Sequence, residues 1–291
     1  MAVNSPTPRS LPRILAVANQ KGGVGKTTST VNIAAAIAQA GHSVLVIDMD
    51  PQGNASTALG ADHREGTRSI YEVLSGELAL VDVLQECPEI GGLWTAPATI
   101  DLAGAEIELV PAFSRELKLK RAIDGVRDDF DWVVIDCPPS LGLLTINALA
   151  ASDDVIVPIQ CEYYALEGLG QLLRNVDLVK KNLNPSLEVS TIVCVMYDSR
   201  TKLADQVVAE VREHFGDKVC KTIVPRNVRL SEAPSYGQPI IVFDSSSRGA
   251  TAYRNVAKEV SGGPAKRGPS PPSSFRSEEH TSELQSRETI S

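Results

Sequence analysis

The sequence predicts an α/β protein with a mostly parallel, doubly wound sheet and helices on both faces. Apolar runs alternate with helical patterns along most of the chain. The runs are nearly all apolar, as strands of a parallel sheet are when both faces are covered. A glycine-rich loop stands between the first run and the first helical pattern. At 291 residues and 43% hydrophobic content, the chain can form one large domain, which we expect at residues 12–261.

The elements follow in order from the N-terminal end. Residues 14–18 predict a strand, and the following helix has Val31, Ala34, Ala35 and Ala38 on one face and stops at Gly41. Further strands are expected at residues 44–47, 93–96, 132–135, 155–159 and 189–195. Further helices are expected at residues 70–74, 80–84, 114–126, 169–176, 203–215 and 252–260.

The loop after the first strand, residues 21–28, reads K-G-G-V-G-K-T-T. Glycines let backbone N–H groups turn inward around phosphate oxygens, and the following helix N-terminus adds positive potential. Strand, glycine loop and helix are the context that a phosphate-binding loop requires. In this interpretation Lys26 reaches the β- and γ-phosphates of a nucleotide, and the Thr27 hydroxyl ligates Mg²⁺.

Acidic residues follow two of the predicted strands. Asp48 and Asp50 come directly after residues 44–47, and Asp136 ends the strand at 132–135. Carboxyl ends of parallel strands share one edge of the sheet, where ligands of open α/β sheets bind. A carboxylate at a strand tip can reach Mg²⁺. We therefore expect Asp136 to hold the ion's water shell, with Asp50 a further candidate ligand. If the bound nucleotide is hydrolysed, Asp50 is the best candidate to orient or activate the attacking water, whereas Asp48 would cap the strand end or support the metal shell.

Composition and charge limit the functions and cellular compartments that the sequence suggests. The net charge of −8 does not suggest a protein that binds nucleic acid. The charge is unevenly distributed, however: residues 186–260 carry ten Lys/Arg and nine Asp/Glu, a net charge of +1, and the remainder of the chain carries −9. The five cysteines are scattered without a C-x-x-C pair, which suits reduced thiols in a cytoplasm. No apolar run approaches 18 residues, so no membrane-spanning helix is expected.

The two ends of the sequence differ in composition from the rest. Residues 1–11 are rich in Ser, Pro and Thr and predict a disordered leader. Residues 262–291 predict a disordered tail. Within it, residues 276–286 read R-S-E-E-H-T-S-E-L-Q-S, which we interpret as the translation of a sequencing adaptor.

The loop departs from the usual phosphate-binding pattern, because Gln20 stands where the first glycine would fall and Lys21 precedes Lys26 by five residues. This pattern resembles the deviant Walker A loop of the ParA/MinD group of P-loop ATPases. Three more segments narrow the resemblance to a ParA-type, chromosomal Soj-like partition ATPase: D-M-D-P-Q-G-N at 48–54, V-V-I-D-C-P-P-S at 133–140 and P-R-N-V-R-L-S-E-A-P-S at 225–235. E-Y-Y-A-L-E-G at 162–168 fits as well.

The resemblance implies an ATPase that dimerises on ATP, binds double-stranded DNA without sequence preference and is stimulated by a ParB-type partner. Segregation of chromosome or plasmid DNA would follow from that cycle. The resemblance also implies a cytoplasmic protein that associates with the nucleoid and does not bind membranes. Lys21 would cross the dimer interface to the partner's phosphates, as an arginine finger does. The implied catalytic residues are Lys21, Lys26 and Asp50, and the implied nucleotide-binding residues are Gly22, Gly23, Val24, Gly25, Lys26, Thr27, Thr28, Met196, Pro225 and Asn227.

For DNA the resemblance points to Arg200 and Arg229, which both follow strand ends in the least acidic part of the chain. Non-specific binding is mainly phosphate neutralisation, so an acidic protein must gather its cations on one face. Two alternatives stay open here: contact with DNA, or pairing of these arginines with neighbours such as Asp198 and Glu232. The patch would be extended by Lys202, Arg248, Arg254 and Lys258.

Three other functions compete with the partition ATPase. A MinD-like membrane-cycling regulator of division shares the loop but needs a C-terminal amphipathic helix, and none is found up to Val260. An iron–sulfur reductase component needs cysteines that bridge a cluster, whereas Cys137 directly follows Asp136 beside the nucleotide. A nucleotide-dependent DNA-binding repressor would differ from a partition ATPase in whether its function requires ATP hydrolysis.

Overall fold

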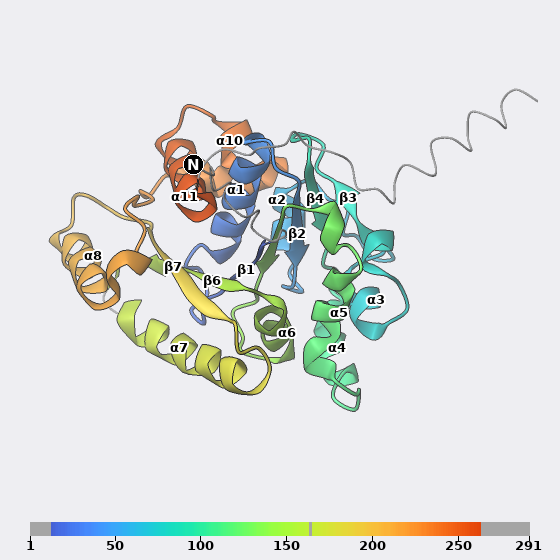
Figure 1. The fold of residues 1–291 in the computed structure, drawn as a ribbon. Helices are drawn as coiled ribbons and strands as arrows, with labels where there is room; N and C mark the ends of the chain where they lie inside the picture. Colours follow the sequence, from blue (N-terminus) through green and yellow to red (C-terminus); the bar gives the residue numbers. More distant parts are fainter. Residues whose placement is uncertain (1–12, 163–164, 263–291) are drawn as a thin grey trace, which may run out of the picture.

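A seven-stranded sheet organises the computed structural model, which describes residues 13–162 and 165–262 (Figure 1). The strand order is β3-β4-β2-β5-β1-β6-β7, and all neighbours are parallel except β3 and β4. The prediction of a mostly parallel doubly wound sheet is confirmed. The strands are β1 (Arg13–Val17), β2 (Val44–Asp48), β3 (Gln85–Glu86), β4 (Leu93–Ala96), β5 (Trp132–Asp136), β6 (Asp154–Gln160) and β7 (Glu188–Val195).

Helices cover both faces of the sheet, because alternate strand residues point to opposite sides and both sides are apolar. In β1, Leu15 and Val17 join the core cluster under one set of helices, whereas Ile14 and Ala16 join the cluster under the other set. The first set is α1 (Lys26–Gln39), α2 (Asn54–Ala58), α10 (Ile240–Phe243) and α11 (Arg248–Ser261). The second set is α3 (Ile70–Ser75), α4 (Leu102–Glu108), α5 (Lys118–Asp124), α6 (Leu143–Ala151), α7 (Ala165–Asn182) and α8 (Lys202–Phe215).

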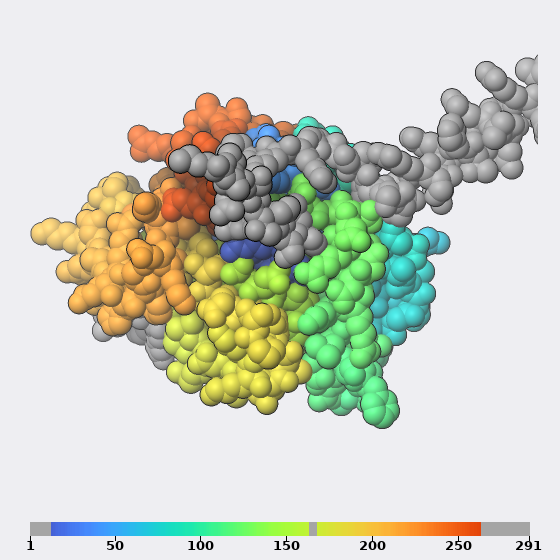
Figure 2. Space-filling model, in the orientation of Figure 1, coloured from blue at the N-terminus to red at the C-terminus, as the bar shows by residue number. Residues whose placement is uncertain are grey.

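The second set forms much of the surface in the space-filling view, where the green region that contains α4 and α5 adjoins the yellow region that contains α7 (Figure 2). A short helix, α9 (Val228–Glu232), precedes the C-terminal elements. The predicted leader and tail, including residues 276–286, lie outside the described residues apart from Gly262, which ends α11 with φ 72°.

Two predicted helices were wrong in detail. The helix expected at 114–126 is a 3₁₀ turn at Arg115–Leu117 followed by α5: Ser114 at φ 50° lies outside the helix, and Leu117, with φ −114° and ψ 10°, separates the turn from α5. The segment expected as a helix at 80–84 is a 3₁₀ turn, Leu80–Val83. Helices α4 and α6 were not predicted. In α6 nearly every residue is apolar and buried, so the sequence carries no one-sided pattern that marks a helix.

Candidate active site

The ends of three strands meet at one edge of the sheet. Val17 of β1 and Asp48 of β2 both lie in register with Asp136 of β5, which separates the two strands. This is the carboxyl edge predicted from the polar residues that follow each apolar run. The strand order places the glycine-rich loop, the D-M-D-P-Q-G-N segment and the end of β5 around one site.

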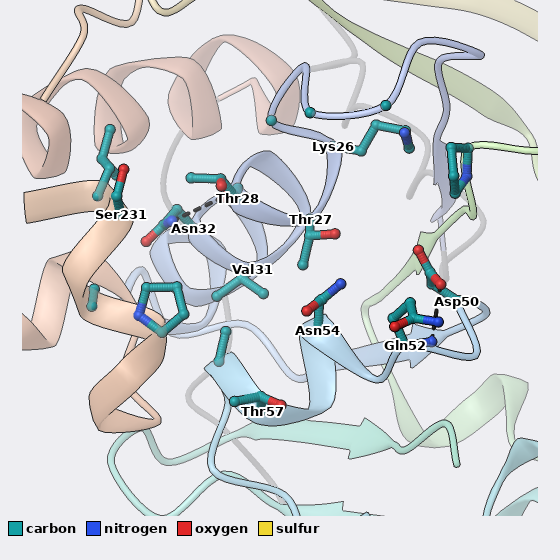
Figure 3. A pocket seen from close by; sticks show the side chains of 18 of the residues that line it. Lys26, Thr27, Thr28, Val31, Asn32, Asp50, Gln52, Asn54, Thr57 and Ser231 are labelled. Atoms are coloured by element: carbon teal, nitrogen blue, oxygen red, sulfur yellow. Dashed lines mark hydrogen bonds between the residues drawn. The ribbon is translucent and has the colours of Figure 1, made fainter. Parts of the chain in front are cut away.

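A cavity of about 510 Å³ opens along this edge (Figure 3). Gly23 and Gly25 have φ of 71° and 79°, a left-handed conformation that side chains with a Cβ rarely adopt. Gly25 stands at the N-cap of α1, which has no side-chain cap, so the first N–H groups of the helix are available at the cavity. Predicted loop residues line the cavity together with Asp50: Gly22, Gly23, Gly25, Lys26, Thr27 and Thr28. Val24, also predicted, is buried and does not line it.

Lys26 places a cation in this cavity with only 7% of the residue exposed. Its Nζ donates to the backbone oxygen of Lys21 over 3.2 Å, which uses one of its three donors. Burial lowers the pKa of Lys26, and the negative charges of Asp136 and Asp50 oppose that shift. A desolvated ammonium with donors to spare fits a phosphate group.

Asp136 is fully buried and receives two hydroxyl groups from α1. Thr27 Oγ1 donates to one carboxylate oxygen and Thr30 Oγ1 to the other, each over 2.7 Å. Desolvation and the charge of Asp48 raise the pKa of Asp136, whereas the two hydroxyl donors oppose the rise. A carboxylate whose two oxygens are both occupied suits a role at the ion's water shell better than direct ligation.

Asp48 and Asp50 have different surroundings. Asp48 is fully buried and accepts from Asp50 N, Ser56 N and Ser56 Oγ over 3.1, 2.8 and 2.7 Å, so it caps the end of β2 and fastens the loop to α2. Asp50 accepts from Gln52 N over 3.0 Å and turns toward the cavity that Lys26 and Thr27 also line (Figure 3).

A second cavity of about 260 Å³ adjoins the first at Gly25 and Thr28. Of the implied nucleotide-binding residues, the three outside the glycine loop, Met196, Pro225 and Asn227, all line it. Two segments far apart in the sequence form its wall because Tyr197 and Pro225 make a parallel bridge. Asn227 is also the N-cap of α9, where its Oδ1 accepts from Arg229 N over 2.9 Å. Its amide nitrogen is therefore the side-chain group that can donate a hydrogen bond to a ligand in this cavity.

Lys21 does not line the first cavity. Its Nζ lies 3.5 Å from Glu162 Oε2, in an ion pair with both side chains nearly half exposed. Arg226 Nη2 lies 3.9 Å from the other oxygen of Glu162. Lys21 is therefore tied to its own subunit by a weak surface pair, from which it can leave at small cost.

Arg200 and Arg229 are both exposed and both paired, which is the second of the two alternatives left open by the sequence. Arg200 Nη2 lies 2.6 Å from Asp198, and Arg229 Nη1 lies 2.9 Å from Glu232. Exposed pairs of this kind do not prevent contact with a phosphate. Of the suggested extension of the patch, Arg254 donates to the backbone oxygen of Ser245 over 2.7 Å, so its charge is partly used inside the chain.

The structure adds residues that sequence reasoning missed. Asn32 donates to Thr28 O and accepts from Ile240 N, each over 2.8 Å, and so joins the first turns of α1 to α10. The only signal in the sequence was an amide in an otherwise apolar helical stretch. Five further polar residues line the first cavity: Gln52, Asn54, Thr57, Ser231 and Gln238.

Comparison with known proteins decides the family. The AAA domain family matches residues 12–189. The chain is 54% identical over 248 residues to the sporulation initiation inhibitor protein Soj of Bacillus subtilis, covering 85% of this chain and 98% of that protein. It is 51% identical to the chromosome partitioning protein ParA of Myxococcus xanthus, covering 85% and 87%. The chain belongs to the ParA/Soj family of partition ATPases. The predicted resemblance and the predicted ATPase are confirmed.

Solved structures agree with the fold of a ParA/Soj protein. A structure described as cobyrinic acid a,c-diamide synthase from Mycobacterium smegmatis, with bound ATP analog and magnesium, has a TM-score of 0.75 and 42% identity, covering 85% of this chain and 93% of that one. The septum site-determining protein MinD of Pyrococcus horikoshii, complexed with Mg-ADP, has a TM-score of 0.68 at 24% identity and supports the fold alone. The higher identity to Soj and ParA over most of their length favours partition over amide synthesis.

Three further observations concern cysteines, metal-binding groups and membrane spans. Cys137 is buried in the apolar core cluster and does not line the first cavity. The described residues contain no group of three or more His, Cys, Asp or Glu side chains placed to hold a metal ion. In the same part of the chain, no helix combines the length and apolar character needed to span a bilayer.

Proposed function

We propose that this chain is a Mg-ATP-dependent partition ATPase that dimerises on ATP, binds DNA without sequence preference and segregates chromosome or plasmid DNA with a ParB-type partner. The observation that carries the proposal is Lys26, a buried cation that shares one open cavity with Asp50 and the first turn of α1. ParA/Soj relatives at about half identity support the wider cycle.

ATP and Mg²⁺ fit the residues of the cavity. Lys26 and the N–H groups of the loop would bind the phosphates, and the Thr27 hydroxyl would ligate the ion, since it already lies 2.7 Å from Asp136. When bound, Mg²⁺ supplies charge neutralisation for phosphoryl transfer. Asp50 would orient the attacking water, because it is the carboxylate that faces the cavity while Asp48 and Asp136 are occupied by protein donors.

Adenine would occupy the second cavity, where Met196 and Pro225 supply apolar contact. Asn227 can still donate from its amide nitrogen to a purine nitrogen, although its oxygen caps α9. The two cavities share Gly25 and Thr28, so a nucleotide that spans them would place its phosphates at the glycine loop.

Lys21 would act across the dimer, where it reaches the phosphates held by the other subunit. A cationic finger of this class contributes roughly 10³–10⁵ in rate. In a single subunit Lys21 pairs with Glu162 and lies outside the residues that line the cavity, which supports a role in trans rather than in cis.

DNA would bind at Arg200 and Arg229, which are carried by two segments that run side by side. Their side chains are 84% and 55% exposed. Dimerisation doubles the number of contacts on one rigid body, which explains why binding would depend on ATP. Association with the nucleoid would follow from this affinity for unrelated DNA.

The proposal is tested with the purified protein and three measurements: ATP hydrolysis with Mg²⁺, mass by light scattering, and binding to duplexes of unrelated sequence. We expect slow hydrolysis, a dimer with ATP but not with ADP, and DNA binding in the ATP state alone. A protein that binds DNA equally with ADP, or that stays monomeric with ATP, would contradict the cycle.

A further inference from the structure

Carboxylates hold both of the arginines proposed to bind DNA. Arg200 donates from Nε and Nη2 to the two oxygens of Asp198 over 2.9 and 2.6 Å. Arg229 donates from Nη1 to Glu232 over 2.9 Å, and its Nε lies 3.4 Å from Asp244. We infer that these carboxylates compete with DNA phosphates for the two arginines and thereby limit the affinity for DNA. The inference rests on the proposed function, which places DNA at this face.

The geometry of the Arg200 pair supports competition. A guanidinium offers a planar fork of N–H groups, and carboxylates and phosphates bind that fork in the same bidentate manner. Asp198 occupies the Nε–Nη2 edge, although the Arg200 side chain is 84% exposed. These bonds hold the pKa of Asp198 well below its usual range, so the carboxylate is charged whenever DNA arrives. A phosphate that needs the same edge must displace Asp198.

Arg229 is held more completely than Arg200. Besides Glu232 and Asp244, its guanidinium lies over the ring of Phe243 at 5.5 Å from the centroid, and that ring stacks on Tyr236 at 4.8 Å. The cation is therefore oriented by an aromatic face and matched by two carboxylates. Removal of one carboxylate leaves the cation–π contact in place, so Arg229 would stay oriented but carry more uncompensated charge.

The two pairs belong to one surface. Tyr197 and Pro225 form a parallel bridge, and Arg226 N donates to Tyr197 O over 2.9 Å, so the loop with Arg200 and the segment with Arg229 are joined a few residues before each arginine. Acidic partners on this surface offset its arginines nearly one for one. Affinity per subunit is then low, and useful binding requires the doubled contacts of a dimer.

The chain supplies a matched control, because Asp62 and Arg64 repeat the arrangement of Asp198 and Arg200. Arg64 donates from Nε and Nη2 to the oxygens of Asp62 over 2.9 and 2.7 Å, and Arg64 N donates to the same side chain over 3.2 Å. Asp198→Asn and Asp62→Asn therefore change the net charge equally and loosen the same kind of pair. In both variants the amide oxygen can still accept from the backbone N–H two residues on, which preserves the turn.

The experiment measures binding of a fluorescent duplex of unrelated sequence, with ATP and Mg²⁺, at two salt concentrations. We expect Asp198→Asn to bind roughly two- to fivefold more tightly per subunit, the range for release of an exposed ion pair, with a steeper salt dependence. Glu232→Gln should act in the same direction. Asp62→Asn should bind like the unaltered chain. Light scattering for each variant ensures that affinities are compared at equal dimer content.

Two results would overturn the inference. One is an Asp198→Asn variant that binds no more tightly than Asp62→Asn. The other is a gain from Asp198→Asn that persists when Arg200→Ala is also present, because Asp198 would then repel DNA directly rather than through Arg200. Failure of the proposed function looks different: Arg200→Ala and Arg229→Ala would bind DNA as well as the unaltered chain, whatever the carboxylate variants do.

Discussion

Thr27 Oγ1 donates to Asp136 Oδ2 over 2.7 Å and so joins the first turn of α1 to the carboxyl end of β5. Thr30, one turn later, holds the other oxygen at the same distance. Asp136 is fully buried between these partners, and removal of one donor would leave a desolvated carboxylate short of hydrogen bonds. The glycine loop is thus attached to a fixed helix start before any ligand binds, which favours a preorganised phosphate site.

Lys26→Ala should weaken ATP binding roughly 10- to 100-fold, because a hydrogen bond between charged groups is worth about 1.5–3 kcal/mol. The variant removes the buried cation of the cavity but leaves the glycine conformations unchanged. Isothermal titration calorimetry measures the affinity, with thermal unfolding as a check that the fold persists. Unchanged affinity in a folded variant would refute the placement of the phosphates.

Asp50→Ala should bind ATP and dimerise but hydrolyse roughly 10²–10⁴-fold more slowly, the usual contribution of a positioned acid or base. The loss is expected because Asp50 alone among the three carboxylates at this edge lines the cavity. Asp50→Asn is the companion variant, since its amide oxygen can still accept from Gln52 N and keep the turn. Turnover at the normal rate in both variants would assign the attacking water to another group.

The sequence predicted the sheet and the site's phosphate half because local signals there are strong. Few other folds are compatible with strands whose residues are nearly all apolar and with a loop whose glycines take positive φ. The different surroundings of Asp48 and Asp50 go with their positions, since one ends a strand and the other stands in the turn beyond it, whereas their roles stay predictions.

Other features depend on contacts between distant segments and could not be predicted. Asn32 is bound to Ile240, more than two hundred residues away, and the helix α6 has no polar face to reveal it. The ion pairs of Arg200 and Arg229 could only be offered as one of two alternatives, because an exposed side chain's partner depends on rotamers that the sequence does not determine. The break between the 3₁₀ turn and α5 lies at Leu117, whose φ of −114° and ψ of 10° its residue type gives no reason to expect.

Asp48→Ala should destabilise the fold rather than change the chemistry. Three donors, including Ser56 N and Ser56 Oγ, lose their buried acceptor, and each group left unsatisfied costs about 1–3 kcal/mol. Urea denaturation should show a lower midpoint with an unchanged slope. Ser56→Ala removes only one of these donors and should cost less. Equal stability of Asp48→Ala and the unaltered chain would contradict the capping role.

Lys21→Ala should still bind ATP but fail to form the ATP dimer, because its ammonium lies outside its own cavity and is free to act across an interface. Lys180→Ala is the matched control: Lys180 has a similar exposure, 39% against 40%, and also pairs with a glutamate. Light scattering with ATP and Mg²⁺ reports the mass. A full dimer in Lys21→Ala would remove the cross-subunit role, and loss of the dimer in Lys180→Ala would make the effect one of general charge.

Arg200→Ala and Arg229→Ala should each weaken ATP-dependent binding to unrelated duplexes by a similar factor. Each variant lacks one cation on a surface where carboxylates already offset much of the positive charge. The loss of DNA-binding free energy per subunit is therefore moderate, and the dimer loses it twice. The salt dependence should flatten by roughly one phosphate contact per subunit. Arg64→Ala, which removes an arginine about as exposed as Arg200 from an equivalent pair elsewhere, is the control for net charge. ATP binding and dimerisation should persist in all three variants, because none of these side chains lines the first cavity. Unchanged DNA affinity in both Arg200→Ala and Arg229→Ala at two salt concentrations would place the DNA-binding face elsewhere on the molecule.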